Sequence, residues 1–217
     1  MTSPMPRARA AQRRASDGAA TAAAILAAAT KEFAAFGFGG GRVDRIADRA
    51  GVSKRMIYHH YANKCGLYVA VLEGAYHQAR VAEQALGLEA LEPPAAMRRL
   101  VESVFDSFVK DRTFIRLMNE ENLHKAIHLK RSWHIAEMHV PLLAAIQTIL
   151  VRGAACGAFR AGLDPLQIWI SIVGISYFYF SNIYTLSTIL RRDFDAVEAR
   201  AARRRHVADV ILAYLRP

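Results

Sequence analysis

The chain has 217 residues, of which 53% are hydrophobic and 22% charged, and this composition excludes a chain too polar to form a packed core. Its net charge is +10, and the first 64 residues hold 11 of the 29 Lys and Arg but only 4 of the 19 Asp and Glu. This uneven charge indicates a polyanion as the partner of the amino-terminal third.

The cysteines and the apolar stretches bear on the cellular compartment. Cys65 and Cys156 form no CxxC pair, which favours a reducing cytosol. The first residues lack the apolar core and cleavage site of a secretory signal. Residues 165–190 carry no charge and could span a bilayer by length, but hydrogen-bonding side chains interrupt the run. We expect a cytoplasmic protein with no membrane segment, in which this stretch is a helix buried by the core and by a partner subunit.

The amino-terminal end is predicted to be a flexible basic arm followed by a helix. Residues 1–16 contain four arginines and two prolines without helical periodicity. Asp17 is a suitable helix cap, and Ile25, Ala29 and Phe33 recur at helical spacing up to Phe36. The glycines that begin at Gly37 then end this helix.

Two short helices separated by a tight turn follow. Val43–Ala50 is predicted to be the first, Gly51 the turn, and Ser53 the cap of the second helix. Ile57 and Tyr61 are expected to face inward. The opposite side of the second helix then presents side chains suited to a DNA groove, namely Lys54, Arg55, Met56, Tyr58 and His59.

This region resembles the DNA-binding domain of TetR/AcrR-type transcriptional regulators. The pattern FxxxGFxxxxVxxIAxxAGVSKxxIYHHYxNKxxLY matches without a gap over about Phe33–Leu72. By position, the resemblance implies base-reading or groove-facing roles for Lys54, Arg55, Met56 and Tyr58, and phosphate contacts for His59, His60 and Lys64. Gly41 and Arg42 depart from the usual Thr and Ser, which removes a capping hydroxyl and adds the cation of Arg42 to the expected DNA-binding set. Arg55 and Met56 replace small residues.

The resemblance implies an all-α fold of about nine helices. A helix-turn-helix domain over residues 17–64 would be followed by a ligand-binding and dimerisation domain over 65–217. The sequence itself predicts helices over Lys64–Leu86, Ala95–Asp111, Val140–Gly153, the charge-free 165–190 and Asp195–Leu215. The helix over 95–111 has the clearest apolar stripe, which comprises Met97, Leu100, Val101, Val104, Phe105 and Phe108.

The middle of the chain mixes apolar and polar residues as a ligand pocket does. Because the family binds its ligand within the carboxy-terminal helices, we expect pocket residues among Phe105, Phe108, Arg116, Asn119, Glu120, Asn122, His124, Trp133 and Tyr177. A likeness to regulators of aromatic catabolism favours a small aromatic or carboxylated effector. The i, i+4 spacing of His124 and His128 keeps a metal-responsive alternative open, although no metal or other cofactor is predicted.

The combined expectation is a homodimeric repressor that a small organic effector releases from a palindromic operator on double-stranded DNA. The alternatives are a metal-responsive repressor or an activator on the same fold. A nonspecific nucleic-acid binder or membrane adaptor remains a third reading. An enzyme is not expected, because the chain has no GxSxG, HExxH, P-loop or dinucleotide motif.

Overall fold

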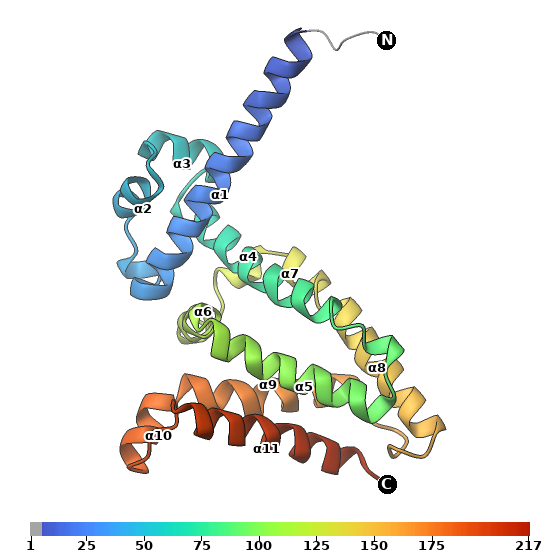
Figure 1. Ribbon diagram of the computed structural model, residues 1–217. Coiled ribbons are helices and arrows are strands. Elements are labelled where there is room, and N and C mark those ends of the chain that lie inside the picture. Colours follow the sequence, from blue (N-terminus) through green and yellow to red (C-terminus); the bar gives the residue numbers. More distant parts are fainter. Residues whose placement is uncertain (1–5) are drawn as a thin grey trace. The chain divides into compact units, whose positions relative to one another are not determined.

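The computed structural model describes the backbone of residues 6–217 and the side chains of residues 17–217. Every regular element within residues 6–217 is a helix, which confirms the predicted all-α fold. The chain divides into two compact units: residues up to Gly74 with Glu120–Arg131, and Ala75–Asn119 with Ser132–Pro217. Two helices labelled in Figure 1, α4 (Lys64–Gln84) and α6 (Thr113–Leu123), therefore contribute residues to both units.

The first unit begins with α1 (Pro6–Gly40), which starts earlier than the predicted helix. Of the predicted flexible arm, residues 1–5 lie outside the described part, and the backbone of residues 6–16 is helical. The alanines and arginines of this stretch are strong helix formers, and proline is accepted at a helix start. At Gly37 the backbone leaves the helical conformation, with φ 65° and ψ −179°, so the long helix ends at the predicted residue and a short helical segment follows it up to Gly40.

The predicted helix-turn-helix is confirmed at its predicted bounds, α2 (Val43–Ala50) and α3 (Lys54–Tyr61). Gly51 adopts the left-handed conformation, φ 68° and ψ 32°, that ends α2 and turns the chain. The hydroxyl of Ser53 accepts a hydrogen bond from the backbone N–H of Met56 at 3.3 Å and caps α3. Figure 1 shows α2 and α3 beside α1, and both pack against it.

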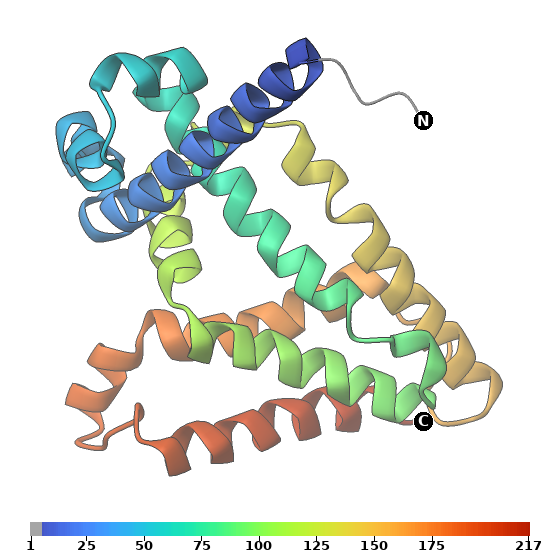
Figure 2. The same cartoon turned by 45° about the horizontal axis from the view of Figure 1, so that its top comes forward.

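The second unit is built around α5 (Pro93–Lys110). Its predicted apolar stripe is buried throughout, as the low exposure of Phe105 (1%) and Phe108 (5%) illustrates. Figures 1 and 2 show α5 beside α9 (Pro165–Ser181) and α11 (Val197–Leu215), and Arg204 of α11 donates two hydrogen bonds of 2.8 Å to Asp106 of α5. The remaining elements are η1 (Leu88–Ala90), η2 (Leu129–Arg131), α7 (His134–Glu137), α8 (Val140–Ala155) and α10 (Ile183–Ile189).

The charge-free stretch is not the single helix that the sequence predicts. Asp164 caps its start by accepting from the N–H of Leu166 at 2.8 Å, but α9 ends at Ser181 and α10 leaves at an angle of 64°. The amide of Asn182 donates to the carbonyl of Phe178 at 3.0 Å, and such side-chain bonds compete with the helical ladder.

Length and hydropathy alone would allow two helical segments and one bent pair of helices to cross a membrane. The two segments are Asp17–Gly40 and His134–Ala155, and the bent pair is α9 with α10. Each has neighbours within its own unit, since α1 packs on α2 while α8 and α9 pack on α5. Their apolar faces therefore contribute to the two cores.

Candidate nucleic-acid interface and ligand cavities

The helix α3 has one inward face and one exposed face. Ile57 is fully buried, and the hydroxyl of Tyr61 donates to the carbonyl of Ala22 in α1 at 2.9 Å. The side chains expected to read DNA lie outward, since Lys54, Arg55, Met56, Tyr58 and His59 are exposed and His60 is half-buried. This face offers cations to phosphates and a guanidinium, a thioether and a phenol to base edges.

An acidic residue that the sequence reading missed lies next to this face. Asp44 of α2 is exposed, and its carboxylate is 2.6 Å from the ammonium of Lys54. The hydrogen bond to Asp44 raises the pKa of Lys54 above its usual value. In the free protein the cation of Lys54 is therefore already paired, and a phosphate would have to compete with Asp44 for it.

The start of α2 is held by a buried carboxylate from α1. Glu32 is fully buried and accepts hydrogen bonds from the backbone N–H of Arg42 at 3.0 Å and from the side chains of Arg45 and Arg49 at 2.7 and 3.3 Å. Burial by itself would raise the pKa of Glu32, but these hydrogen bonds and charges lower it below 4.5. Glu32 thus replaces the capping hydroxyl that is missing before α2, and it leaves the Arg42 side chain exposed.

Gly41 departs from the family pattern for a steric reason. It is buried, and a Cβ atom at this position would lie 2.6 Å from the ring of Phe33. The aromatic ring therefore fills the space in which a threonine side chain would lie.

Lys64 is half-buried beside the ring of Phe38, with its ammonium 4.7 Å from the ring centroid. Burial lowers the pKa of Lys64, and the nearby charge of Arg42 lowers it further. Two of the predicted DNA-contacting cations, Arg42 and Lys64, are therefore close enough to influence each other, although one precedes α2 and the other begins α4.

The end of α6 belongs to the first unit, where it holds the kink of α1. Glu120, predicted to line a ligand pocket, accepts a hydrogen bond from the backbone N–H of Phe38 at 2.9 Å. A Cβ atom on Gly37 would lie 2.5 Å from the same carboxylate. The neighbouring Glu121 is buried, and its two oxygens are 2.8 Å from Nδ1 of His128 and 2.9 Å from the N–H of Leu129.

The other predicted pocket residues separate into two groups. Phe105 and Phe108 are core residues of the second unit, where Phe108 lies 6.2 Å from the ring of Tyr177 and the hydroxyl of Tyr177 donates to Asn119. Four others are exposed, namely Arg116, Asn122, His124 and Trp133. In the second unit the structure thus brings Phe108, Tyr177 and Asn119 together, while Glu120 and His124 contact each other in the first unit.

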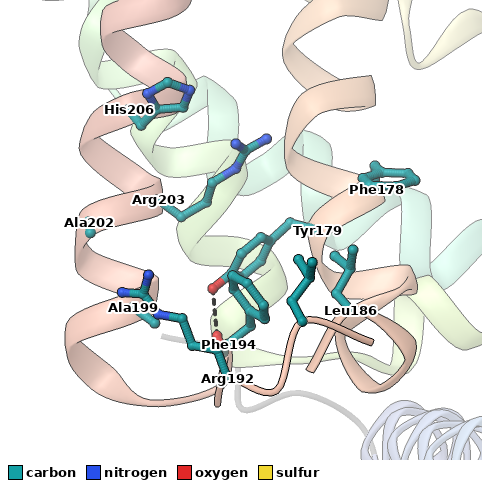
Figure 3. A pocket seen from close by; sticks show the side chains of 10 residues that line it. Phe178, Tyr179, Leu186, Arg192, Phe194, Ala199, Ala202, Arg203 and His206 are labelled. Carbon is teal, nitrogen blue, oxygen red and sulfur yellow. Dashed lines mark hydrogen bonds between the residues drawn. The ribbon is translucent and has the colours of Figure 1, made fainter. Parts of the chain in front are cut away.

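An open groove of about 380 Å³ lies between α9, α10 and α11, as shown in Figure 3. The hydroxyl of Tyr179 donates to the carbonyl of Phe194 at 2.5 Å across its floor, and the guanidinium of Arg203 lies 5.7 Å from the Tyr179 ring. Phe178 lies at its rim and is 55% exposed.

A second, smaller cavity of about 40 Å³ lies between α4 and α8. Two charged residues of α4, Arg80 and Glu83, form part of its wall, and neither was a candidate from sequence. The available signal was helical spacing, because Tyr76, Arg80 and Glu83 follow at intervals of four and three and share one face of α4. The predicted pocket residues line neither of the two cavities.

The histidines of the middle region have separate partners. Nδ1 of His124 lies 2.9 Å from the carbonyl of Glu120, His128 pairs with Glu121, and Nδ1 of His139 lies 2.8 Å from the carbonyl of Ile135. Among the described residues, no three His, Cys, Asp or Glu side chains come together as metal ligands do.

Two family models match the chain. Residues 25–71 match "Bacterial regulatory proteins, tetR family", and residues 93–211 match "Tetracyclin repressor-like, C-terminal domain". A relative along most of the chain is the HTH-type transcriptional repressor NicS of Pseudomonas putida, which is 33% identical over 192 residues and covers 88% of this chain and 91% of its own length.

Solved structures share the fold. A bacterial regulatory protein in the tetR family from Rhodococcus RHA1 superposes with a TM-score of 0.70 at 22% identity, covering 90% of this chain and 97% of its own. The transcriptional regulator FadR of Bacillus subtilis, solved in complex with stearoyl-CoA, superposes with a TM-score of 0.69 at 18% identity, covering 88% and 98%.

Proposed function

This chain belongs to the TetR family of bacterial transcriptional regulators, and we propose that it is a homodimeric repressor that a small organic effector releases from a palindromic operator. The observation that carries this proposal is the exposed face of α3. Its side chains are accessible to solvent and suit contacts with the major groove of DNA, namely those of Lys54, Arg55, Met56, Tyr58 and His59. Repression is favoured over activation because the relative from Pseudomonas putida is named a repressor.

The proposed DNA surface extends beyond α3 to cations at its border. Arg42, His60 and Lys64 lie in the same unit, at the start of α2, the end of α3 and the start of α4. Such positions suit phosphate contacts, which fix the position of the protein on the DNA without selecting a base sequence. Arg55 and Met56 are the residues expected to select bases, and because they depart from the family pattern, we expect an operator particular to this chain.

The proposed dimer forms through the outer faces of α9 and α11. These packed helices expose large apolar side chains, among them Ile170 (53%), Phe178 (55%), Val210 (38%) and Tyr214 (57%). A monomer in water would leave this surface unburied, and an isologous contact with a second copy would cover it. The α3 helices of the two subunits would then bind half-sites about one turn of the DNA helix apart. We propose that the protein acts in the cytoplasm and has no membrane partner.

The proposed effector acts by favouring a conformation in which the distance between the two α3 helices of the dimer no longer matches the distance between the half-sites. It is a small organic molecule bound by the second unit, whose helices form a core rich in aromatic side chains. An organic effector is favoured over a metal ion, because among the described residues no three His, Cys, Asp or Glu side chains come together as metal ligands do.

Footprinting on the promoter of the protein's own gene tests this function. We expect a protected palindrome at physiological salt, and a promoter–reporter fusion should become more active when the gene is deleted. Uniform protection along the fragment would indicate a nonspecific nucleic-acid binder, and lower reporter activity after deletion would indicate an activator.

A further inference from the structure

A buried ion pair in the second unit is only partly satisfied. Arg80 is 7% exposed, and its Nη2 donates to Oε1 of Glu83 at 2.8 Å. Nε and Nη1 of Arg80 and Oε2 of Glu83 are also buried, yet they have no hydrogen-bond partner among the described residues. Leaving such bonds unmade is destabilising, so an arginine in this state is unusual unless something else binds it.

The surroundings of the Arg80 guanidinium are aromatic. Its carbon lies 5.1 Å from the centroid of the Trp169 ring, and the rings of Tyr76 and His139, whose centroids are 5.4 Å apart, also lie near it. Burial lowers the pKa of His139, and the charge of Arg80 contributes to this, so His139 is neutral at pH 7. Besides Glu83, Tyr76 and His139 are described titratable groups that interact electrostatically with Arg80.

The cavity beside this pair has a definite size. Its volume of about 40 Å³ is completed by Gln84, Leu88, Met138, Pro141, Leu142 and Ala145, none of which carries a charge. At about 10–15 Å³ for each water, this space holds about three water molecules. Three atoms are also the size of a carboxylate group, and an arginine fork matches a carboxylate in geometry and charge.

We propose that this cavity receives the carboxylate of a small organic anion, which binds the N–H groups of Arg80 that have no partner in the chain. This inference rests on the proposed function, because it assigns the chemical class of the effector and the residue that recognises it.

Glu83 makes this binding depend on pH. Burial raises the pKa of Glu83 to about 7, while the charge of Arg80 acts in the opposite direction. A bound carboxylate takes over part of the charge of Arg80 and places a second anion beside Glu83, so Glu83 takes up a proton from solvent when the ligand binds. Binding is therefore tightest below pH 7 and weakens above it.

The chain offers a built-in reporter for this test. It contains two tryptophans, and Trp133 is 63% exposed while Trp169 faces Arg80. In a W133F background, the emission of Trp169 is followed while acetate, propionate and benzoate are added at constant ionic strength, each against its neutral amide. Inorganic phosphate serves as the control for a nonspecific anion. We expect at least one carboxylate to bind saturably and about tenfold more tightly than its amide and than phosphate.

Three variants assign the site to a residue. Arg80→Gln is expected to weaken carboxylate binding about tenfold or more, whereas Arg99→Gln, which changes an exposed arginine of α5, leaves it unchanged. Glu83→Gln removes the competing carboxylate, so binding at pH 8 becomes severalfold tighter and its pH dependence disappears. A misfolded protein could not produce this gain, and circular dichroism checks the fold of each variant.

The outcomes separate this inference from the proposed function. If no carboxylate binds more tightly than its amide, or if Arg80→Gln binds as the parent does, the carboxylate site is refuted even if footprinting finds an operator. If the site binds as described but no palindrome is protected, the repressor proposal fails while the carboxylate site stands.

Discussion

The backbone N–H of Arg42 donates to the buried carboxylate of Glu32 at 3.0 Å, so α1 supplies the cap of α2. Arg45 and Arg49, on successive turns of α2, approach the same carboxylate. One acid therefore fixes the helix that precedes the DNA-facing α3, and the stability of the first unit should depend on it.

Replacement of this acid by its amide tests that dependence. Glu32→Gln keeps the volume but loses the charge that two arginines surround, and since Arg45 and Arg49 are partly exposed we expect a loss of about 1–3 kcal/mol in unfolding free energy at pH 7. Because the pKa of Glu32 is lowered in the fold, its contribution is present above about pH 4.5 and is lost as the pH falls below that value. Urea denaturation at pH 7 and pH 4 measures both effects.

Asp48→Asn is the matched control for this experiment, because Asp48 is an exposed acid on α2, the helix that Glu32 caps. It should change the unfolding free energy by less than about 0.5 kcal/mol. If both variants were equally stable at pH 7, Glu32 would have no special role.

The second prediction concerns how Glu83 changes the free energy of unfolding near neutral pH. The pKa of Glu83 is about 7 in the fold against 4.5 for an ordinary glutamate, and this difference corresponds to about 3 kcal/mol. Since the folded state holds this proton more tightly, the stability that protonated Glu83 contributes is fully present below pH 4.5 and is lost as the pH rises through 7. Urea denaturation between pH 5 and pH 8 should show this decline in the parent and a flatter profile in Glu83→Gln.

The DNA surface predicts two distinguishable kinds of defect. Lys64→Gln should weaken binding to specific and unrelated DNA alike and reduce the slope of log K against log salt by about 1, because one phosphate contact is lost. Arg55→Gln should instead cost about 1–3 kcal/mol on the operator and little on unrelated DNA. Fluorescence anisotropy at several salt concentrations measures both, and identical behaviour of the two variants would contradict the assigned roles.

The ion pair between Lys54 and Asp44 predicts a gain of binding. Asp44→Asn frees the ammonium of Lys54, which lies 2.6 Å from the Asp44 carboxylate, and it removes a negative charge near the phosphates. We expect severalfold tighter binding to unrelated DNA at low salt. Weaker binding would mean that Asp44 orients Lys54 for contact rather than withholding it.

The proposed dimer predicts an oligomeric change. Phe178→Glu places a charge on the exposed face of α9 and should convert the protein to a monomer that binds the operator at least about tenfold more weakly. Leu123→Glu, at a residue of α6 that is 76% exposed, should leave the dimer intact. Sedimentation velocity measures the oligomeric state of both variants. A Phe178→Glu variant that remained dimeric would show that the interface lies elsewhere.

The sequence predicted well what depends on neighbours in the chain. The bounds of α2 and α3, the Ser53 cap and the buried stripe of α5 follow from turn chemistry and helical period. The break at Asn182 escaped prediction because an apolar run favours a continuous helix, whereas an asparagine side chain can bond the preceding turn.

Contacts between distant segments could not be predicted. Glu120 looked like a pocket residue because its neighbours are mixed in polarity, yet its carboxylate accepts from Phe38, which lies far earlier in the chain. Arg80 and Glu83 were not singled out from the sequence, and only the helices that cover them reveal that they are buried. Periodicity identifies the face of a helix but not what lies against it.

Because the first unit includes Glu120–Arg131, its DNA-binding part cannot simply be joined to the effector domain of another regulator. A reader cut from this protein after residue 64 or 74 would lack Glu120–Arg131, and with them the acceptor for the N–H of Phe38 and the buried pair of Glu121 and His128. A transplant of this reader onto another effector domain therefore needs a matching acid at the end of the recipient's corresponding helix. Pairs of family members that share this feature are the ones between which readers should be exchangeable.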